Sequence, residues 1–252
     1  MKISIITVCF NSADTLAATL RSVREQTYQD IEHIVIDGGS TDKTMEVLAS
    51  AGPHVAKIVS EPDRGIYDAM NKGLAVATGD IVGFLNSDDV LSHAAVVSTI
   101  AGALTDPAID ACYGDLVYVA QHDLNKLVRY WKSSDYRPGL FERGWVPAHP
   151  TFYARRTLYQ RYGGFDLQFR LAADFEMLLR LFEAHNIVSV YIPEVLVKMR
   201  LGGATNVSFE NVRRQNMEIA RAFRKYGLQP GLKLFAFRLM SRLSQFLRKP
   251  VR

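Results

Sequence analysis

The chain has 252 residues, of which 48% are hydrophobic and 22% charged, proportions typical of a folded globular protein and not of a disordered one. The two cysteines, Cys9 and Cys112, lie in apolar runs, so we expect buried reduced thiols in a cytoplasmic protein and no disulfide framework. No window reaches the roughly 18 apolar residues of a spanning helix, and the chain begins with a strand pattern instead of a signal peptide.

The net charge of +4 conceals an asymmetry between the body and the tail of the chain. Residues 219–252 contain nine Lys or Arg and no Asp or Glu, whereas the rest contains 21 basic and 26 acidic side chains. This distribution predicts an anionic partner for the tail alone. A nucleic-acid partner is not expected, because the basic residues are confined to one tail and match no known binding motif.

Up to about residue 105, strand-like apolar runs alternate regularly with amphipathic helical segments. This alternation predicts an α/β protein with a mostly parallel central sheet flanked by helices. The expected strands are 3–10, 31–36, 54–60 and 81–85, and the expected helices are 13–26, 43–49, 66–77 and 94–104.

Beyond residue 105 the pattern becomes irregular. We expect strands at 111–120, 126–131, 187–191 and 195–200, and helices at 156–162, 172–183, 209–226 and 232–248. The aromatic- and proline-rich segment 132–157 suits a ligand-binding loop, although plain packing explains it as well. We divide the chain into a domain over 1–205, with halves 1–120 and 121–205, and a basic, amphipathic C-terminal helical extension over 206–252.

Carboxylates follow two of the expected strands. Asp88 and Asp89 come after 81–85, and Asp37 comes after 31–36. Ligands of open α/β sheets collect at the carboxyl ends of the strands, and adjacent acids repel each other unless a cation or ligand compensates. A polar strand exit that caps the next helix is the alternative. Gly38 and Gly39 match neither a dinucleotide fingerprint nor a phosphate loop, which argues against redox and P-loop chemistry.

The last expected helix, 232–248, has one apolar, aromatic-rich side and one basic side. Such a helix at a chain end suits an interfacial membrane anchor. It also suits packing against its own domain or against a second subunit in a homodimer. The pattern alone leaves these alternatives open.

Several short segments, taken together, resemble the family 2 glycosyltransferases, which have the GT-A type fold that binds nucleotide-diphospho-sugars. The segments that carry this resemblance are 4–11, 37–42, 61–65, 68–73, 79–80 and 84–89. Further along the chain, 149–150 and 173–176 resemble the acceptor-side half of members that assemble bacterial surface polysaccharides.

The resemblance implies a role for each matching residue. A UDP-, GDP- or dTDP-sugar donor would contact Thr7, Phe10, Asn11, Asp37, Asp63, Arg64, Gly65, Asn71, Asp88 and His149. Asp89 would bind Mg²⁺ or Mn²⁺ at the diphosphate, and Asp174 would be the general base. For His149, a packed loop histidine is the alternative. Many members have Glu where this chain has Ala173, which leaves Glu176 as a reserve candidate for the base.

The implied activity is inverting transfer of a sugar from the donor to a hydroxyl of a glycan acceptor, lipid-linked in bacterial polysaccharide synthesis. We expect a cytoplasmic enzyme that is peripheral on the inner membrane if its tail binds lipid. One rival is a nucleotidyltransferase, which needs a glycine-rich or basic loop near the N-terminus; residues 10–13 contain neither glycine nor a basic residue. The other rival is a non-catalytic subunit that binds nucleotide-sugar or carbohydrate.

Overall fold

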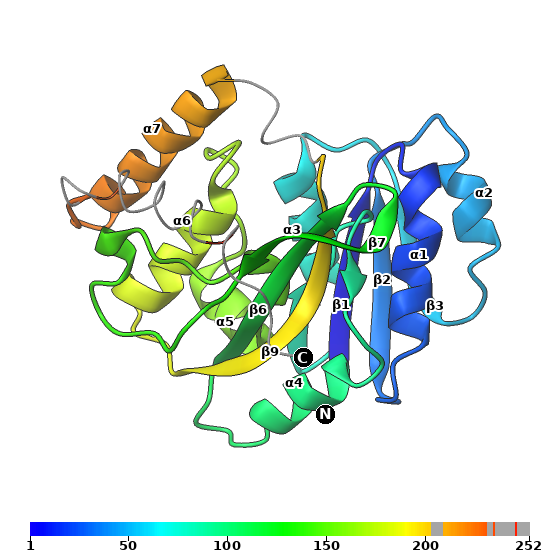
Figure 1. Cartoon of the computed structure of the whole chain (residues 1–252), viewed down its shortest axis with the longest axis horizontal. Helices are drawn as coiled ribbons and strands as arrows, with labels where there is room; N and C mark the ends of the chain where they lie inside the picture. Colours follow the sequence, from blue (N-terminus) through cyan, green and yellow to red (C-terminus); the bar gives the residue numbers. More distant parts are fainter. Residues whose placement is uncertain (203–208, 231–233, 235–244, 246–252) are drawn as a thin grey trace.

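The computed structural model describes residues 1–202, 209–230, 234 and 245. Its described strands form one mixed sheet in the order β3-β2-β1-β4-β8-β6-β9-β5, with β7 paired to β6 (Figure 1). The sheet runs without a break across residue 120, which is the last residue of β6. The two halves expected on either side of that residue therefore share one scaffold.

The first half is a parallel α/β unit, as predicted. Four parallel strands, β1 to β4, alternate with three helices, α1 to α3, and a fourth helix, α4, follows. The bounds are β1 Ile3–Cys9, α1 Ala13–Arg24, β2 Ile31–Asp37, α2 Thr44–Ala49, β3 Val55–Ser60, α3 Ile66–Val76, β4 Ile81–Phe84 and α4 Val96–Ala103.

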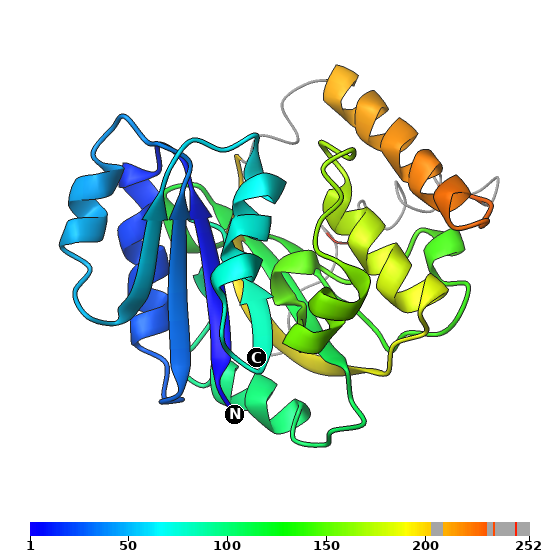
Figure 2. The same cartoon turned by 180° about the vertical axis from the view of Figure 1, so that it is seen from behind.

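Helices cover both faces of these strands (Figure 2). On one face, Leu16 and Leu20 of α1 pack with Cys9 and Val35. On the other face, Met70 of α3 packs in the largest core cluster, which also takes in residues of β1 and β2. Strands covered on both sides need near-continuous apolar runs, and β1 is buried along its whole length.

The remaining strands add antiparallel pairs and a long parallel strand. They are β5 Val90–Leu91 and β6 Ala111–Ala120, at the end of the first half, and β7 Asp123–Trp131, β8 Tyr153–Arg155 and β9 Ser189–Arg200 in the second. The helical segments are the 3₁₀ turns Phe141–Arg143 and His149–Thr151, α5 Arg156–Tyr162, α6 Ala173–Leu179, the π turn Arg180–Ala184 and α7 Phe209–Lys225. The strands expected at 111–120 and 126–131 correspond to β6 and β7, which pair antiparallel as a hairpin.

One sequence prediction for these strands was wrong, and one strand was missed. The segments expected as separate strands at 187–191 and 195–200 form the single strand β9, whose register against β6 shifts after Gly114 and so accommodates Pro193. The two-residue strand β5, which pairs with β9 just after Asp89, was missed because so short a strand has no periodicity.

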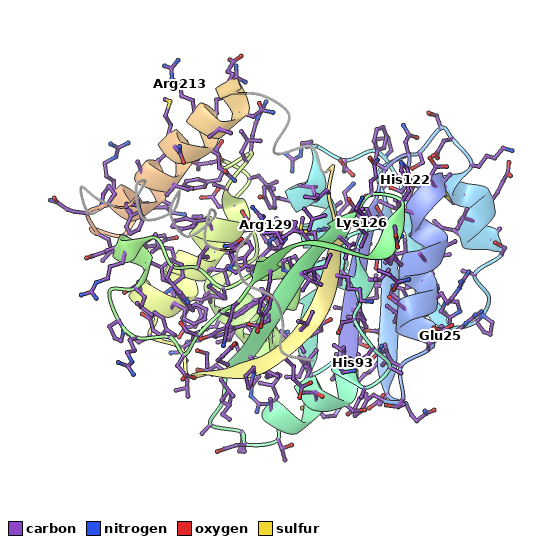
Figure 3. All side chains as sticks on the ribbon, viewed as in Figure 1. Glu25, His93, His122, Lys126, Arg129 and Arg213 are labelled. Carbon is purple, nitrogen blue, oxygen red and sulfur yellow. The ribbon has the colours of Figure 1, made fainter. Side chains whose placement is uncertain are left out.

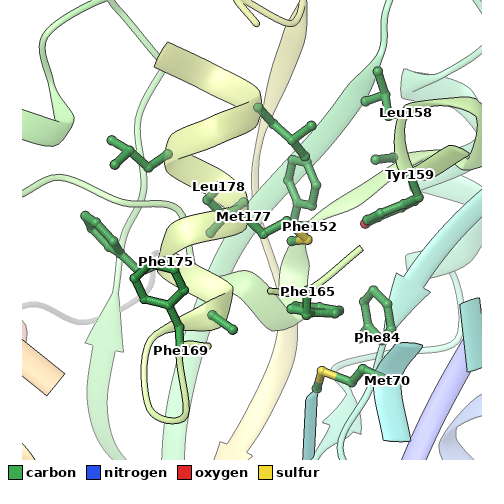
Figure 4. Packing of buried hydrophobic residues seen from close by; sticks show 14 of the residues in the cluster. Met70, Phe84, Phe152, Leu158, Tyr159, Phe165, Phe169, Phe175, Met177 and Leu178 are labelled. Atoms are coloured by element: carbon green, nitrogen blue, oxygen red, sulfur yellow. The ribbon is translucent and has the colours of Figure 1, made fainter. Parts of the chain in front are cut away.

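The largest core cluster contains residues of both halves and so joins them (Figure 4). Phe84 of β4 packs edge-on against Phe165, with ring centroids 5.1 Å apart. Met177 of α6 lies in the same cluster, which therefore fixes α6 relative to β4.

The helix α7 packs on α6 and contributes Ile219, Ala222 and Phe223 to this core. Most of the last expected helix, 232–248, lies outside the described residues. Its two described residues, Leu234 and Gln245, are both buried, and Leu234 belongs to the largest core cluster. Among the described helices, none has the length and apolar character needed to cross a membrane.

Candidate active site

The carboxyl ends of the four parallel strands meet at one edge of the sheet. Phe10 follows β1, Asp37 ends β2, Asp63 lies in the loop after β3, and Asp88 with Asp89 follows β4. Parallel strands bring their ends together, so the topology gathers the acids that the sequence places far apart.

Phe10 and Asp63 meet above Gly38. A Cβ added at Gly38 would lie 2.3 Å from Asp63 Oδ2 and 3.5 Å from the Phe10 ring, so a side chain there would displace the Asp63 carboxylate. The Phe10 side chain is 61% exposed, although it is a large apolar ring. Asp63 Oδ1 accepts a hydrogen bond from the Gly65 N–H at 2.8 Å. An exposed ring can stack on a planar base, and the carboxylate beside the ring can accept a hydrogen bond from the edge of that base.

Asp37 and Asn11 shape the loop around this corner. Asp37 is fully buried, and its oxygens accept hydrogen bonds from the Ser40 hydroxyl at 2.5 Å and the Ser60 hydroxyl at 2.6 Å. Burial alone would raise the pKa of Asp37, but these bonds and two backbone N–H bonds lower it. Asn11 has a φ of 49°, and its Oδ1 accepts from the Thr41 N–H at 2.9 Å.

Thr7 and Asn71 do not belong to this edge. Thr7 is fully buried in the sheet, where its hydroxyl lies 3.0 Å from Nε2 of His33. The Asn71 side chain makes two bonds to the backbone of Phe165, at 2.8 and 2.9 Å. Both residues were expected to contact the donor, but here their polar atoms are used inside the protein.

Arg64 and Gly65 lie just before α3. Gly65 has a φ of 117°, which disfavours any side chain, and it immediately precedes the helix. Arg64 bonds Asp68 through its backbone N–H and its guanidinium, both at 3.0 Å, while its side chain remains 79% exposed. The guanidinium is therefore free to move toward an anionic ligand.

Asp88 and Asp89 differ in burial. Asp89 is 0% exposed; its Oδ1 accepts from the Arg200 N–H at 3.3 Å and its Oδ2 from Asn86 Nδ2 at 3.2 Å. Asp88 is only partly buried. Burial raises the pKa of Asp89 well above its usual range, and the charge of Asp88 adds to this; burial also raises the pKa of Asp88.

The same cluster contains an acceptor without a donor. Asn86 Oδ1 is buried and has no hydrogen-bond partner among the described residues. Two acids that resist ionisation beside an unused oxygen suit a hard divalent cation, which prefers oxygen ligands. Within the described part of the chain, no three His, Cys, Asp or Glu side chains converge as a metal site, so such a cation would need further ligands from a bound diphosphate. Asp88 is the more accessible of the two acids, whereas Asp89, the expected metal ligand, is fully buried.

Asp174 lies in the first turn of α6, held by two side chains. Its Oδ1 accepts a hydrogen bond from the Tyr67 hydroxyl at 2.9 Å, and its Oδ2 lies 3.3 Å from His149 Nδ1. The Asp174 side chain remains 25% exposed. Burial lowers the pKa of His149 despite the opposing charge of Asp174, and burial, followed by Asp174, raises the pKa of Tyr67 well above its usual range. The Tyr67 hydroxyl thus orients the Asp174 carboxylate beside His149 and leaves it accessible.

Glu176 is not placed to act as a base. It is 0% exposed and pairs with Lys225 Nζ at 2.6 Å, and the Tyr226 hydroxyl also donates to it. Its carboxylate joins α6 to the end of α7. The reserve assignment of Glu176 therefore has no support in the geometry.

Two residues at the site were missed from the sequence. Tyr67 lies inside the segment 66–77 that we interpreted as a helix, and only its contact with Asp174, 107 positions away, reveals its role. Arg200 ends β9 and donates its N–H to Asp89, 111 positions away. No local pattern encodes contacts at such separations.

Comparison with known proteins identifies the relatives of this chain. The profile of the family described as "Glycosyl transferase family 2" matches residues 4–172. An uncharacterised glycosyltransferase of Mycobacterium tuberculosis is 39% identical over 184 residues, covering 71% of this chain and 68% of the relative. A PGL/p-HBAD biosynthesis glycosyltransferase of Mycobacterium bovis is 32% identical over 208 residues, covering 81% and 78%.

Solved structures share the fold. The Staphylococcus aureus TarS fragment in complex with UDP-GlcNAc has a TM-score of 0.71 at 18% identity, covering 97% of this chain and 73% of that one. The mannosyltransferase PcManGT of Pyrobaculum calidifontis, in complex with GDP-Man and Mn²⁺, has a TM-score of 0.66 at 22% identity, covering 95% and 68%. The expected GT-A type fold is confirmed.

Proposed function

Because the chain belongs to glycosyl transferase family 2, we propose that it transfers a sugar from a nucleotide-sugar donor to an acceptor hydroxyl, with inversion at the anomeric carbon. The observation that carries this proposal is the Asp174 carboxylate, which Tyr67 and His149 hold in place while leaving it accessible. Tyr67 is the second residue of α3, soon after the loop that carries Asp63, so it ties Asp174 to the sheet edge where the other acids gather.

The nucleobase would stack on Phe10 and donate a hydrogen bond to Asp63. A carboxylate accepts from the ring N–H of uracil or thymine, or from the N–H edge of guanine. This supports a UDP-, dTDP- or GDP-sugar. Asp37 and Asn11 would act indirectly, by holding the loop beneath the base.

The diphosphate would lie near Asp88, with Arg64 able to reach it. Asp88, supported by Asp89 and Asn86, would hold Mg²⁺ or Mn²⁺, which stabilises the negative charge of the departing nucleoside diphosphate. The orphaned Asn86 oxygen and the raised pKa values of both acids support this assignment. The related mannosyltransferase structure contains Mn²⁺ with its donor.

Asp174 would act as the general base. As the acceptor oxygen attacks the anomeric carbon, its proton passes to Asp174, the new glycosidic bond forms, and the bond to the diphosphate oxygen breaks. The attack comes from the side opposite the leaving group, so the anomeric configuration inverts. Tyr67 and His149 orient the carboxylate, which keeps it aligned with the acceptor hydroxyl.

The acceptor would be a glycan of the bacterial cell surface, lipid-linked and presented at the cytoplasmic face of the inner membrane. The curated relative in PGL/p-HBAD biosynthesis supports an acceptor from surface glycolipid assembly. The strongly basic tail supports contact with anionic lipid.

A thermal-shift screen tests the donor. Nucleoside diphosphates and nucleotide-sugars of all five bases are compared with and without Mn²⁺. We expect a metal-dependent rise in melting temperature with uracil, thymine or guanine nucleotides, and the base that gives the largest rise identifies the donor. Phe10→Ala should remove the rise. No rise with any nucleotide would contradict the proposal, and pyrophosphate release from a nucleoside triphosphate would favour a nucleotidyltransferase instead.

Liposome flotation tests the membrane surface. We expect the protein to float with anionic vesicles at low salt and to float less when Arg238, Arg242 and Arg248 are replaced by Ser. Equal flotation of both proteins would contradict lipid binding by the tail. A dimer in sedimentation would favour a second subunit as its partner.

A further inference from the structure

Side chains on one side of α7 contact the loop that leads into α6, and Figure 2 shows the helix running beside this part of the chain. Four side chains of α7, spaced along the helix, contact the loop at 166–172. Lys225 pairs with Asp166 at 2.8 Å, Arg221 bonds Gln168 at 2.6 Å, Gln215 bonds the Leu171 carbonyl at 3.2 Å, and Glu218 binds the backbone between them.

Glu218 makes the most concentrated of these contacts. Its Oε1 accepts from the Arg170 N–H at 3.1 Å, and its Oε2 accepts from the N–H groups of Leu171 at 2.8 Å and Ala172 at 2.9 Å. The first turn of a helix leaves backbone N–H groups without partners, and a side chain at the cap usually accepts from one of them. Ala172, the residue at the cap, has no side chain able to do so. The N–H groups that Glu218 binds lie just before this first turn, so its carboxylate holds the segment that enters α6.

The contacts of Glu218 with the loop affect the position of the candidate base, Asp174. Asp174 follows Ala172 by two residues, so a displacement of the backbone at 170–172 moves its carboxylate away from Tyr67 and His149. The helix that supplies Glu218 is itself anchored, because Ile219 and Phe223 are fully buried. The Phe223 ring packs 5.7 Å from that of Phe175, the residue next to Asp174.

We propose that Glu218 is a positioning residue for Asp174: its carboxylate holds the backbone of residues 170–172 and so keeps the base aligned with the acceptor hydroxyl. The proposal rests on the proposed function, because it presumes that Asp174 is the base. It makes α7 a working part of the acceptor side of the enzyme and not an appendage of it.

The test compares Glu218→Gln with Glu210→Gln, a matched loss of one carboxylate on the same helix. Glu210 is 66% exposed and pairs only with Arg214 among the described residues, one turn along the helix. The outward side of this part of α7 is visible in Figure 3, where Arg213 points away from the body of the protein. Amide exchange in the free protein, nucleotide binding and the rate of sugar transfer are measured for both variants.

We expect amide exchange at 170–174 to be at least tenfold faster in Glu218→Gln and unchanged in Glu210→Gln. The turnover number should fall at least tenfold in Glu218→Gln, with nucleotide Kd within twofold of the unmodified protein. Unchanged exchange, or a turnover number within twofold while Asp174→Asn is inactive, would overturn the proposal.

Two further outcomes are separable. If Glu218→Gln does not fold, Glu218→Asp keeps the charge and withdraws the carboxylate by one methylene, and the same measurements on it decide the question. If the unmodified protein transfers no sugar from any donor, the proposed function fails. The exchange measurement then still decides whether Glu218 holds the segment that carries Asp174.

Discussion

The acids after β4 and the acid at the start of α6 have opposite surroundings. Asp89 is fully buried beside another carboxylate, and its pKa is raised well above the usual range. Asp174 is 25% exposed and lies between the Tyr67 hydroxyl and the His149 ring. The first environment penalises negative charge, whereas the second orients a carboxylate and leaves it accessible.

This difference separates two chemical roles that a list of aspartates cannot separate. A repelling, poorly solvated pair becomes favourable when a divalent cation binds, so the region after β4 suits the diphosphate end of the donor. A single oriented carboxylate suits proton removal from a hydroxyl. Substitutions at Asp174, Asp88, Asp89 and Tyr67 change one side of this contrast, and a substitution at Glu32 tests the effect of burial elsewhere in the protein.

Replacing Asp174 by Asn should have the largest effect. The amide has nearly the same shape but cannot accept the acceptor proton, so we expect the rate of transfer to fall about 10³-fold, within the range typical of general bases. Nucleotide binding in the presence of Mn²⁺ should change less than twofold. Rates from a coupled assay of nucleoside diphosphate release, together with calorimetric titration, check both statements; full activity in the variant would remove Asp174 as the base.

Asp88→Asn and Asp89→Asn should differ in kind. We expect Asp88→Asn to lower transfer about 100-fold and to abolish the dependence of nucleotide binding on Mn²⁺. Asp89→Asn should raise the metal-free free energy of unfolding by about 1 kcal/mol, because it removes a buried charge that its surroundings oppose. Denaturant melts in a chelator measure this. A less stable Asp89→Asn protein would mean that Asp89 is a well-satisfied anion.

Glu32 shows that burial alone does not set this behaviour. It is 8% exposed, and burial would raise its pKa, yet bonds from Ser4, Thr78 and Lys2 outweigh burial and lower the pKa to about 2. A lowered pKa stabilises the fold at pH values above the unfolded value of 4.5, and this contribution is lost as the pH falls toward 2.

Glu32→Gln should therefore lower the free energy of unfolding at pH 7 by about 2–3 kcal/mol. It should also flatten the pH dependence of stability between pH 5 and pH 2. Glu25, an exposed acid at the end of α1 that Figure 3 labels, provides the control, and Glu25→Gln should change stability by less than about 0.5 kcal/mol. Equal pH profiles for the two variants would contradict the hydrogen-bond explanation.

The sequence predicted most of the scaffold, because parallel strands buried on both faces need long apolar runs and these are readable locally. It also predicted that acids would gather where those strands end. It could not predict that Thr7 and Asn71 direct their polar atoms into the protein. Both residues lie in segments that match the family, and only the folded structure shows which atoms their side chains contact.

The sequence also could not predict which side chains position Asp174. Its three supports, Tyr67, His149 and Glu218, come from elements separated by long stretches of chain and have no shared spacing. The segments 187–191 and 195–200 were expected as two strands, yet they form the single strand β9, whose register against β6 shifts beside Pro193. Such a shift depends on the partner strand and not on the segment itself.

Tyr67→Phe should have the smallest effect on activity. It removes one hydrogen bond of 2.9 Å to Asp174 but leaves the stack of Tyr67 on Phe165, so the ring stays in place. A hydrogen bond to a charged group contributes about 1.5–3 kcal/mol, and since His149 still holds the other oxygen we expect the lower end, about a tenfold fall in turnover number. Tyr191→Phe is the matched control, because it removes a tyrosine-to-aspartate bond of equal length, to Asp115. Turnover should fall in Tyr67→Phe alone; an equal fall in both would mean that the loss reflects general packing and not the orientation of the base.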